Sequence, residues 1–187
     1  MANDDNALKQ GADTIKATVD AINAVASLLS SDRTVVIEVN NFTTANLTLG
    51  PTTHKHGGFG LLPPLNIPPR QTALFGSQGS GILTGTEGEI SFNIDGIDTF
   101  TVKWDVPFTG NNSCDDTVEG ARRNRYVSFS MAGNGNHAQM RFMIGNRSIP
   151  YSITQILKGE ADLSRGLRQF FKTPLPSTTS VRDFLKV

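Results

Sequence analysis

Hydrophobic residues recur at steps of three and four from about Asn6 to Ser30, where alanine is abundant and proline is absent. The apolar series is Leu8, Ala12, Ile15, Val19, Ile22, Ala26 and Leu29. Polar residues follow the same rhythm on another face: Lys9, Asp13, Lys16, Asp20, Asn23 and Ser27. The pattern predicts an amphipathic helix of about 36 Å, slightly longer than a hydrocarbon core of about 30 Å.

After Ser31-Asp32 the chain becomes rich in β-branched residues, and a strand is predicted from Thr34 to Asn40, with a second short strand near Asn46 to Leu49. Two hairpins follow: Ile90 to Ile94 with Ile97 to Trp104 around Asp95-Gly96, and Tyr126 to Met131 with Ala138 to Ile144 around Asn134-Gly135. Both dipeptides suit a type I′ turn. Residues 50–70, rich in glycine and proline, are expected to form an irregular connection without a long element.

Beyond Asn146 the pattern becomes helical again, at Ile153 to Leu157 and at Leu163 to Phe171. The predicted fold class is mainly β, a β-sandwich with an N-terminal amphipathic α-helix and a C-terminal helical extension. The expected segments are 1–32 for the helix, 33–146 for the sandwich and 147–187 for the extension.

Charge and cysteine content narrow the functional classes. Seventeen basic residues balance 17 acidic residues, so no global field attracts the chain to nucleic acid. The single cysteine, Cys114, excludes an intramolecular disulfide framework and a thiolate zinc cluster. No secretory signal is visible at the N-terminus, and no apolar run approaches the roughly 20 residues of a transmembrane helix. We therefore expect a soluble resting form that inserts into membranes only conditionally.

Enzymatic and metal chemistry find little support in the sequence. There is no Gly-x-Ser-x-Gly motif, and the run from Gly76 to Gly81, which is read as a turn between strands, lacks the Lys-Ser or Lys-Thr of a phosphate loop. His54 and His56 alternate with Lys55, but two imidazoles without a third ligand are a weak zinc signal. Trp104 lies in an alternating strand and is expected in the core. No catalysis, cofactor or metal is expected.

The order of helix, strand and sandwich is accompanied by more specific local matches. The sharpest runs from Thr84-Gly85-Thr86-Glu87-Gly88 through Trp104-Asp105-Val106-Pro107-Phe108, and weaker ones lie at Ile67-Pro68, Ala73 to Gln78 and Asn136 to Ile144. In these stretches, over roughly residues 6 to 145, the chain resembles the actinoporin-like pore-forming cytolysins.

This resemblance implies a cytolysin that binds target membranes through the sandwich, forms a homo-oligomer and inserts the N-terminal helix. The helix would swing out at Ser30-Ser31-Asp32. Its expected membrane-inserting residues are Leu8, Ile15, Val19, Ile22 and Leu29. Its expected pore-lining residues are Asp13, Lys16, Asp20 and Asn23. Oligomers are required because a lone helix would bury charged groups in lipid. Taken without the resemblance, the same pattern equally suits a helix packed permanently on the sandwich.

The chain departs from the family after Phe108, where the tryptophans and clustered tyrosines that bind phosphocholine in that family are missing. A quaternary ammonium needs an aromatic cage, whereas the forked N–H donors of an arginine guanidinium favour phosphate or carboxylate oxygens. We therefore expect anionic lipid or an acidic glycan as the ligand. The predicted headgroup or glycan surface consists of Asp105, Val106, Pro107, Phe108, Arg122 and Arg123. The alternative for the arginines is a solvated entry to a strand.

A second function remains open. Fungal fruit-body lectins share the sandwich but lack the N-terminal helix, and the stretch from Arg123 to Asn146 resembles them about as well. A carbohydrate-binding lectin is therefore the alternative to a pore former. A cytolysin would be released or secreted without a visible signal peptide and would act at the target-cell membrane.

Overall fold

The computed structural model describes residues 18–147. A helix over residues 18–27 precedes the strands, and a short 3-10 helix, η1, spans Arg123–Arg125. The strands are β1 (Thr34–Phe42), β2 (Leu47–His56), β3 (Gly58–Leu61), β4 (Asn66–Ile67), β5 (Gln71–Gln78), β6 (Thr86–Ile94), β7 (Asp98–Val106), β8 (Ser113–Gly120), β9 (Tyr126–Ala132) and β10 (His137–Asn146).

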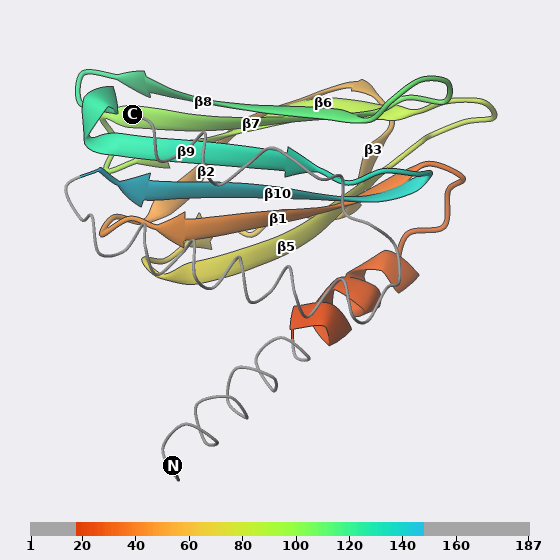
Figure 1. Cartoon of the computed structure of the whole chain (residues 1–187), viewed down its shortest axis with the longest axis horizontal. Coiled ribbons are helices and arrows are strands. Elements are labelled where there is room, and N and C mark those ends of the chain that lie inside the picture. The colour runs from red at the N-terminus through yellow and green to blue at the C-terminus, as the bar shows by residue number, and fades with distance from the viewer. Residues whose placement is uncertain (1–17, 148–187) are drawn as a thin grey trace, which may run out of the picture. The chain divides into compact units, whose positions relative to one another are not determined.

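The strands form two five-stranded sheets that pack face to face (Figure 1). The first sheet has the order β3-β5-β1-β10-β9, and the second has the order β4-β2-β6-β7-β8. β1 pairs with β10 in parallel, and the other neighbouring strands in the two sheets pair antiparallel. The prediction of a mainly β sandwich preceded by a helix is confirmed. The predicted C-terminal helical extension lies outside the described residues.

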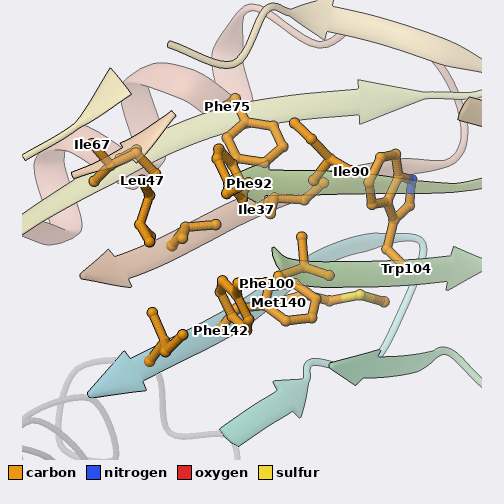
Figure 2. Close-up of a cluster of buried hydrophobic side chains, with 14 of the residues drawn as sticks. Ile37, Leu47, Ile67, Phe75, Ile90, Phe92, Phe100, Trp104, Met140 and Phe142 are labelled. Carbon is orange, nitrogen blue, oxygen red and sulfur yellow. The ribbon is translucent and has the colours of Figure 1, made fainter. Parts of the chain in front are cut away.

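The core lies between the sheets and follows from the alternation of apolar residues along their strands. Ile90 and Phe92 on β6, with Phe100 on β7, face Ile37 on β1 and Phe142 on β10 (Figure 2). Trp104 is 1% exposed, so its predicted place in the core is confirmed. Because both sheets contribute large side chains to one cluster, the sandwich holds together without a disulfide among these strands.

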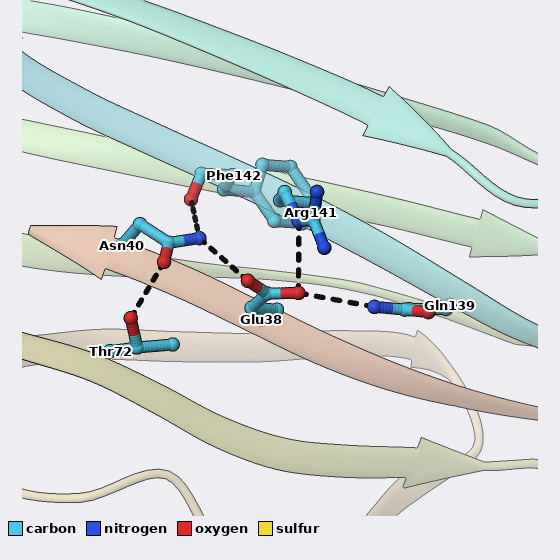
Figure 3. A network of polar contacts seen from close by, with 6 residues as sticks. All are labelled: Glu38, Asn40, Thr72, Gln139, Arg141 and Phe142. Atoms are coloured by element: carbon cyan, nitrogen blue, oxygen red, sulfur yellow. Dashed lines mark hydrogen bonds and ion pairs between the residues drawn. The ribbon is translucent and has the colours of Figure 1, made fainter. Parts of the chain in front are cut away.

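A buried ion pair joins the two central strands of the first sheet on its outer face. Glu38 on β1 is directly opposite Arg141 on β10, and Arg141 Nε donates to Glu38 Oε2 at 2.9 Å. Gln139 and Asn40 also donate to the Glu38 carboxylate, and Asn40 accepts from Thr72 on β5 (Figure 3). Removing one partner of such a buried pair typically costs about 3–5 kcal/mol. The pair therefore links β1 to β10 at the position where Glu38 and Arg141 are opposite each other.

The apolar face of the helix packs on the first sheet. Val25 and Leu29 form a buried cluster with Val36 on β1, flanked by Leu61 and Leu74. A Cβ added at Gly60 would lie 2.5 Å from Leu29 Cδ2, and one at Gly76 would lie 2.9 Å from Leu29 Cδ1. These two positions therefore leave the space that Leu29 fills. Within residues 18–147, no helix is both long and apolar enough to cross a bilayer.

The structure locates part of the predicted amphipathic pattern. Ile22 and Leu29, predicted to enter the membrane, lie against the first sheet, while Asp20 and Asn23, predicted to line a pore, are exposed. Val19 is partly buried. The remaining predicted members of both sets, Leu8, Ile15, Asp13 and Lys16, lie outside the described residues. The roles of all these residues in a membrane remain predictions.

The expectation that residues 50–70 contain no long element is wrong. β2 covers Leu47–His56 and pairs with β6, with register shifts between Leu49 and Thr52 and between His54 and His56. The first shift falls at Gly50-Pro51, because proline has no amide to donate to a ladder and is accommodated at bulges and edges. The short strands β3 and β4 follow.

Only one of the two predicted turns has the expected geometry. Asp95 and Gly96 both have positive φ, 51° and 67°, as a type I′ turn requires. In the second hairpin the loop covers residues 133–136, and within its dipeptide only Gly135 has a positive φ, 87°. Asn112 pins this longer loop by donating to the carbonyls of Gly133 and Gly135. The type I′ prediction is therefore wrong there.

The fit of Leu29 against Gly60 generates a test of helix packing. A valine at position 60 would collide with Leu29 and with the Gln78 amide, which accepts from the Ser30 backbone N–H. Overpacking typically costs about 1–3 kcal/mol, so in Gly60→Val the amide protection of residues 21–29 should fall about tenfold to a hundredfold in hydrogen exchange. Gly58→Val is the matched control, because nothing lies within 4 Å of its added Cβ. Equal protection in the two variants would contradict this packing.

Candidate functional site

The two ends of the sandwich differ in chemistry. Strand directions bring the segment 28–33 and the loops 79–85, 107–112 and 133–136 to one end, at the right of Figure 1, which we call the hinge end. The turns 95–97 and 121–125 lie at the opposite end, which we call the arginine end. The helix therefore joins the sandwich at the hinge end.

An apolar tip stands on the glycine-rich loop 79–85 of the hinge end. Ile82 is 92% exposed and Leu83 is 65% exposed. Leu83 has a φ of 60°, a left-handed conformation that costs a non-glycine residue energy. Thr84 Oγ1 braces the loop by accepting from the Gly81 N–H at 2.9 Å and donating to the Gly81 carbonyl at 2.8 Å. Large exposed apolar residues on a strained, braced loop indicate an interaction site.

Arg33 ties the hinge segment to the loop of the Val-Pro motif. Its Nε donates to the Pro107 carbonyl at 3.2 Å, its Nη2 donates to the Phe108 carbonyl at 2.7 Å, and its guanidinium carbon lies 4.7 Å from the centre of the Phe108 ring. The Arg33 carbonyl accepts from the Gly79 N–H at 2.9 Å. One residue before β1 therefore connects the apolar loop 79–85 with the loop 107–112.

A pocket of about 310 Å³ opens between these loops. Its lining includes Leu83, Phe108, His56, Glu87 and Asp105. Burial, and then the neighbouring Glu87 carboxylate, raise the pKa of Asp105. Glu87 is paired with Lys55, whose Nζ lies 3.1 Å from Glu87 Oε2, whereas Asp105 forms no ion pair within residues 18–147. Asp105 is therefore the acid of this pocket that could take a cationic group. Within residues 18–147, no group of three or more His, Cys, Asp or Glu side chains could hold a metal ion.

The predicted arginine pair is not at this pocket. Arg122 Nε and its backbone N–H both bind the carboxylate of Asp98, the first residue of β7, while Asp105 and Pro107 lie at the far end of that strand. Seven residues of strand correspond to about 23 Å. The single surface predicted from Asp105, Pro107, Phe108, Arg122 and Arg123 is therefore wrong in its geometry. The reason is β8, an unpredicted strand that carries the chain from one end of the sandwich to the other.

His54 belongs to the closure of the core and not to a metal site. Its Nε2 lies 3.1 Å from Ser77 Oγ, and its ring makes edge contacts with Phe59 and Trp104 at centroid distances of 4.4 and 5.3 Å. His56 is on the other side of a register shift and lies 4.0 Å from Glu87. Burial lowers the pKa of His54, because the packed site disfavours an imidazolium.

Comparison with known proteins relates the chain to others by fold. No protein-family model matches it, and no curated protein matches it in sequence. The crystal structure of the lipid-binding protein Nakanori is similar with a TM-score of 0.58 and 15% identity, over 74% of this chain and 80% of that one. RahU, solved with a TRIS molecule, has a TM-score of 0.53 and 15% identity, over 63% of this chain and 97% of that one. IP-1A from Alcaligenes faecalis has a TM-score of 0.50 and 17% identity, over 66% and 98%. At these identities the likeness is one of fold alone.

The packing of His54 predicts how stability depends on pH. Its pKa is lowered on folding from an ordinary value of 6.5, so below that pH the unfolded chain binds a proton that the folded chain resists. Stability should therefore be full above pH 6.5 and fall as the pH decreases towards the folded-state pKa. Thermal unfolding, followed by Trp104 fluorescence, should show a loss from neutral to acidic pH that is smaller in His54→Gln. Identical pH profiles for His54→Gln and the parent would refute this role.

Proposed function

We propose that this protein binds lipid membranes through its hinge end and, after the N-terminal helix leaves the sandwich there, permeabilises them as a homo-oligomer. The observation that carries the proposal is the exposure of Ile82 and Leu83 at the same end of the sandwich as the junction between helix and β1. In this proposal the chain acts by binding and insertion, without catalysis, at the membrane of a target cell.

The apolar tip supplies an anchor. Burying a leucine or isoleucine side chain contributes about 1.5–3 kcal/mol, and two neighbouring side chains on a rigid loop enter a bilayer together with little loss of conformational freedom. Phe108, on the adjoining loop, is partly exposed and adds apolar area beside the tip. The likeness of fold to the lipid-binding protein Nakanori makes lipid a reasonable partner for this end.

The pocket beside the anchor supports a particular headgroup chemistry. Glu87 and Asp105 line it, and the Arg33 guanidinium nearby is already engaged with the carbonyls of Pro107 and Phe108. Glu87 is paired with Lys55, so an ammonium group, as in a zwitterionic lipid, would bind at Asp105. Anionic lipid or an acidic glycan is instead a candidate ligand for the arginine end.

In this proposal Arg33 links membrane contact to the release of the helix. Entry of the Phe108 loop into the interface would disturb the contacts that hold the hinge segment, and Leu29 would then exchange the sheet for lipid. Asp20 and Asn23 lie on the polar side of the helix and would face a water-filled pore. Several copies are needed, because one helix alone would place these polar groups in hydrocarbon. A second copy could also cover the Val36 surface that the helix leaves.

The apolar tip provides the direct test. The double variant Ile82→Ser/Leu83→Asn removes both anchors, and asparagine tolerates the left-handed backbone at position 83. The concentration needed for half-maximal dye release from vesicles of zwitterionic lipid should rise by at least about tenfold, corresponding to about 1.4 kcal/mol of lost anchoring. Ile97→Ser is the matched control, because Ile97 is 53% exposed at the opposite end and should not contribute.

Two outcomes would contradict the proposal. Dye release by the double variant at the parental concentration would show that the hinge end does not anchor the protein. Agglutination of cells by the parent, blocked by a simple sugar and without any leakage, would instead favour the lectin.

A further inference from the structure

Four arginines converge at the arginine end of the sandwich. Arg122, Arg123 and Arg125 lie in the turn between β8 and β9, and Arg147 directly follows β10. The Arg125 backbone N–H donates to the Arg122 carbonyl at 2.8 Å, and the Arg147 N–H donates to the Arg125 carbonyl at 2.7 Å. Backbone hydrogen bonds therefore hold all four at one corner, which we call the arginine corner.

The corner is built around the buried carboxylate of Asp98. The side chain of Asp98 is 0% exposed, and its two oxygens accept from the Arg122 N–H at 2.7 Å and from Arg122 Nε at 3.1 Å. Gly120 has a φ of 123°, and a Cβ there would lie 2.4 Å from Asp98 Oδ1, so only glycine lets the chain turn this closely. Asp98 thus anchors one arginine and fixes the path of the others.

The three outer arginines differ from Arg122 in their surroundings. Arg123, Arg125 and Arg147 are exposed, and among residues 18–147 no carboxylate forms an ion pair with them. Asp95 and Glu119 lie on the adjoining turn and strand end, also without an ion pair to the corner. Arg122 Nη2 is buried and has no hydrogen-bond partner in the part of the chain that the structure describes. Like charges held together repel, so this arrangement does not serve stability, but it presents forked donors suited to oxyanions.

We propose that the arginine corner binds a sulfated or carboxylated polysaccharide. Lipid phosphate offers similar oxyanions, and the choice between the two rests on the proposed function. With the hinge end in a bilayer, the corner stands about 30 Å away, the length of the nine-residue strand β7. Charges in solution are screened beyond about 8 Å at physiological salt, so headgroups of the same bilayer do not attract the corner. An acidic glycan chain projecting from a cell surface reaches it.

Heparin oligosaccharide is the probe, and binding to the full-length protein is measured by titration calorimetry in the absence of membranes, at low and at physiological salt. Arg123→Ala/Arg125→Ala should weaken binding by at least about tenfold, whereas Arg123→Lys/Arg125→Lys should recover part of the loss, since lysine keeps the charge but not the fork. Lys55→Ala/Lys103→Ala is the control: it also removes two positive charges, on the outer face of the second sheet, and should bind as the parent does. Trp104 fluorescence verifies that each variant is folded.

Parental affinity in Arg123→Ala/Arg125→Ala would overturn the proposal, and so would an equal loss in the lysine control, which would indicate unspecific attraction. Loss of binding to phosphatidylserine vesicles with heparin binding intact would assign the corner to lipid instead. Because heparin binding is measured without vesicles, its result is independent of the dye-release test of the hinge end.

Discussion

The structure depends on the burial of β1 on both faces. Its inner side chains, such as Ile37, fill the core between the sheets, while its outer face lies under Val25 and Leu29 of the helix and carries the Glu38–Arg141 ion pair. A strand buried on both faces tolerates no slip in register, because a shift by one residue would exchange Glu38 with the core. That register also positions Arg33, and with it the hinge segment, between the loops 79–85 and 107–112.

The rigid sandwich separates two surfaces with opposite chemistry. The hinge end presents exposed apolar side chains, a pocket with two acids and the junction with the helix. The arginine corner presents the exposed side chains of Arg123, Arg125 and Arg147, which form no ion pair within residues 18–147. Antiparallel strands account for this separation, since loops that are near neighbours in sequence, such as 107–112 and 121–125, lie at opposite ends. In the proposed function, one end contacts lipid while the other stays in solution, where a different class of ligand can reach it.

Sequence reasoning succeeded where a local pattern determines structure. The helix, the strand that begins at Thr34 and the Asp95-Gly96 turn could be predicted, because each reflects backbone preference or burial within a few residues. β8 was missed because its sequence is mostly polar and none of its residues is fully buried, although Cys114 and Val118 pack against the core. The start of β2 was predicted as a short strand near Asn46 to Leu49, but its continuation to His56 was missed because Gly50-Pro51 lies inside it, at a register shift. Without β8, Arg122 was placed beside Phe108. Arg33 could not be recognised, since its role depends on contacts with residues more than 70 positions away.

The central claim, that the hinge end and not the arginine end enters the bilayer, is tested most directly by a polarity-sensitive fluorophore at each end. Cys114→Ser removes the only native thiol, and Leu83→Cys or Ile97→Cys then places a single label at the hinge end or at the opposite end. On addition of zwitterionic vesicles, the label at position 83 should shift its emission to the blue and be quenched by brominated lipid, while the label at position 97 should keep its aqueous spectrum. Quenching at position 97 with an unchanged signal at position 83 would contradict the account.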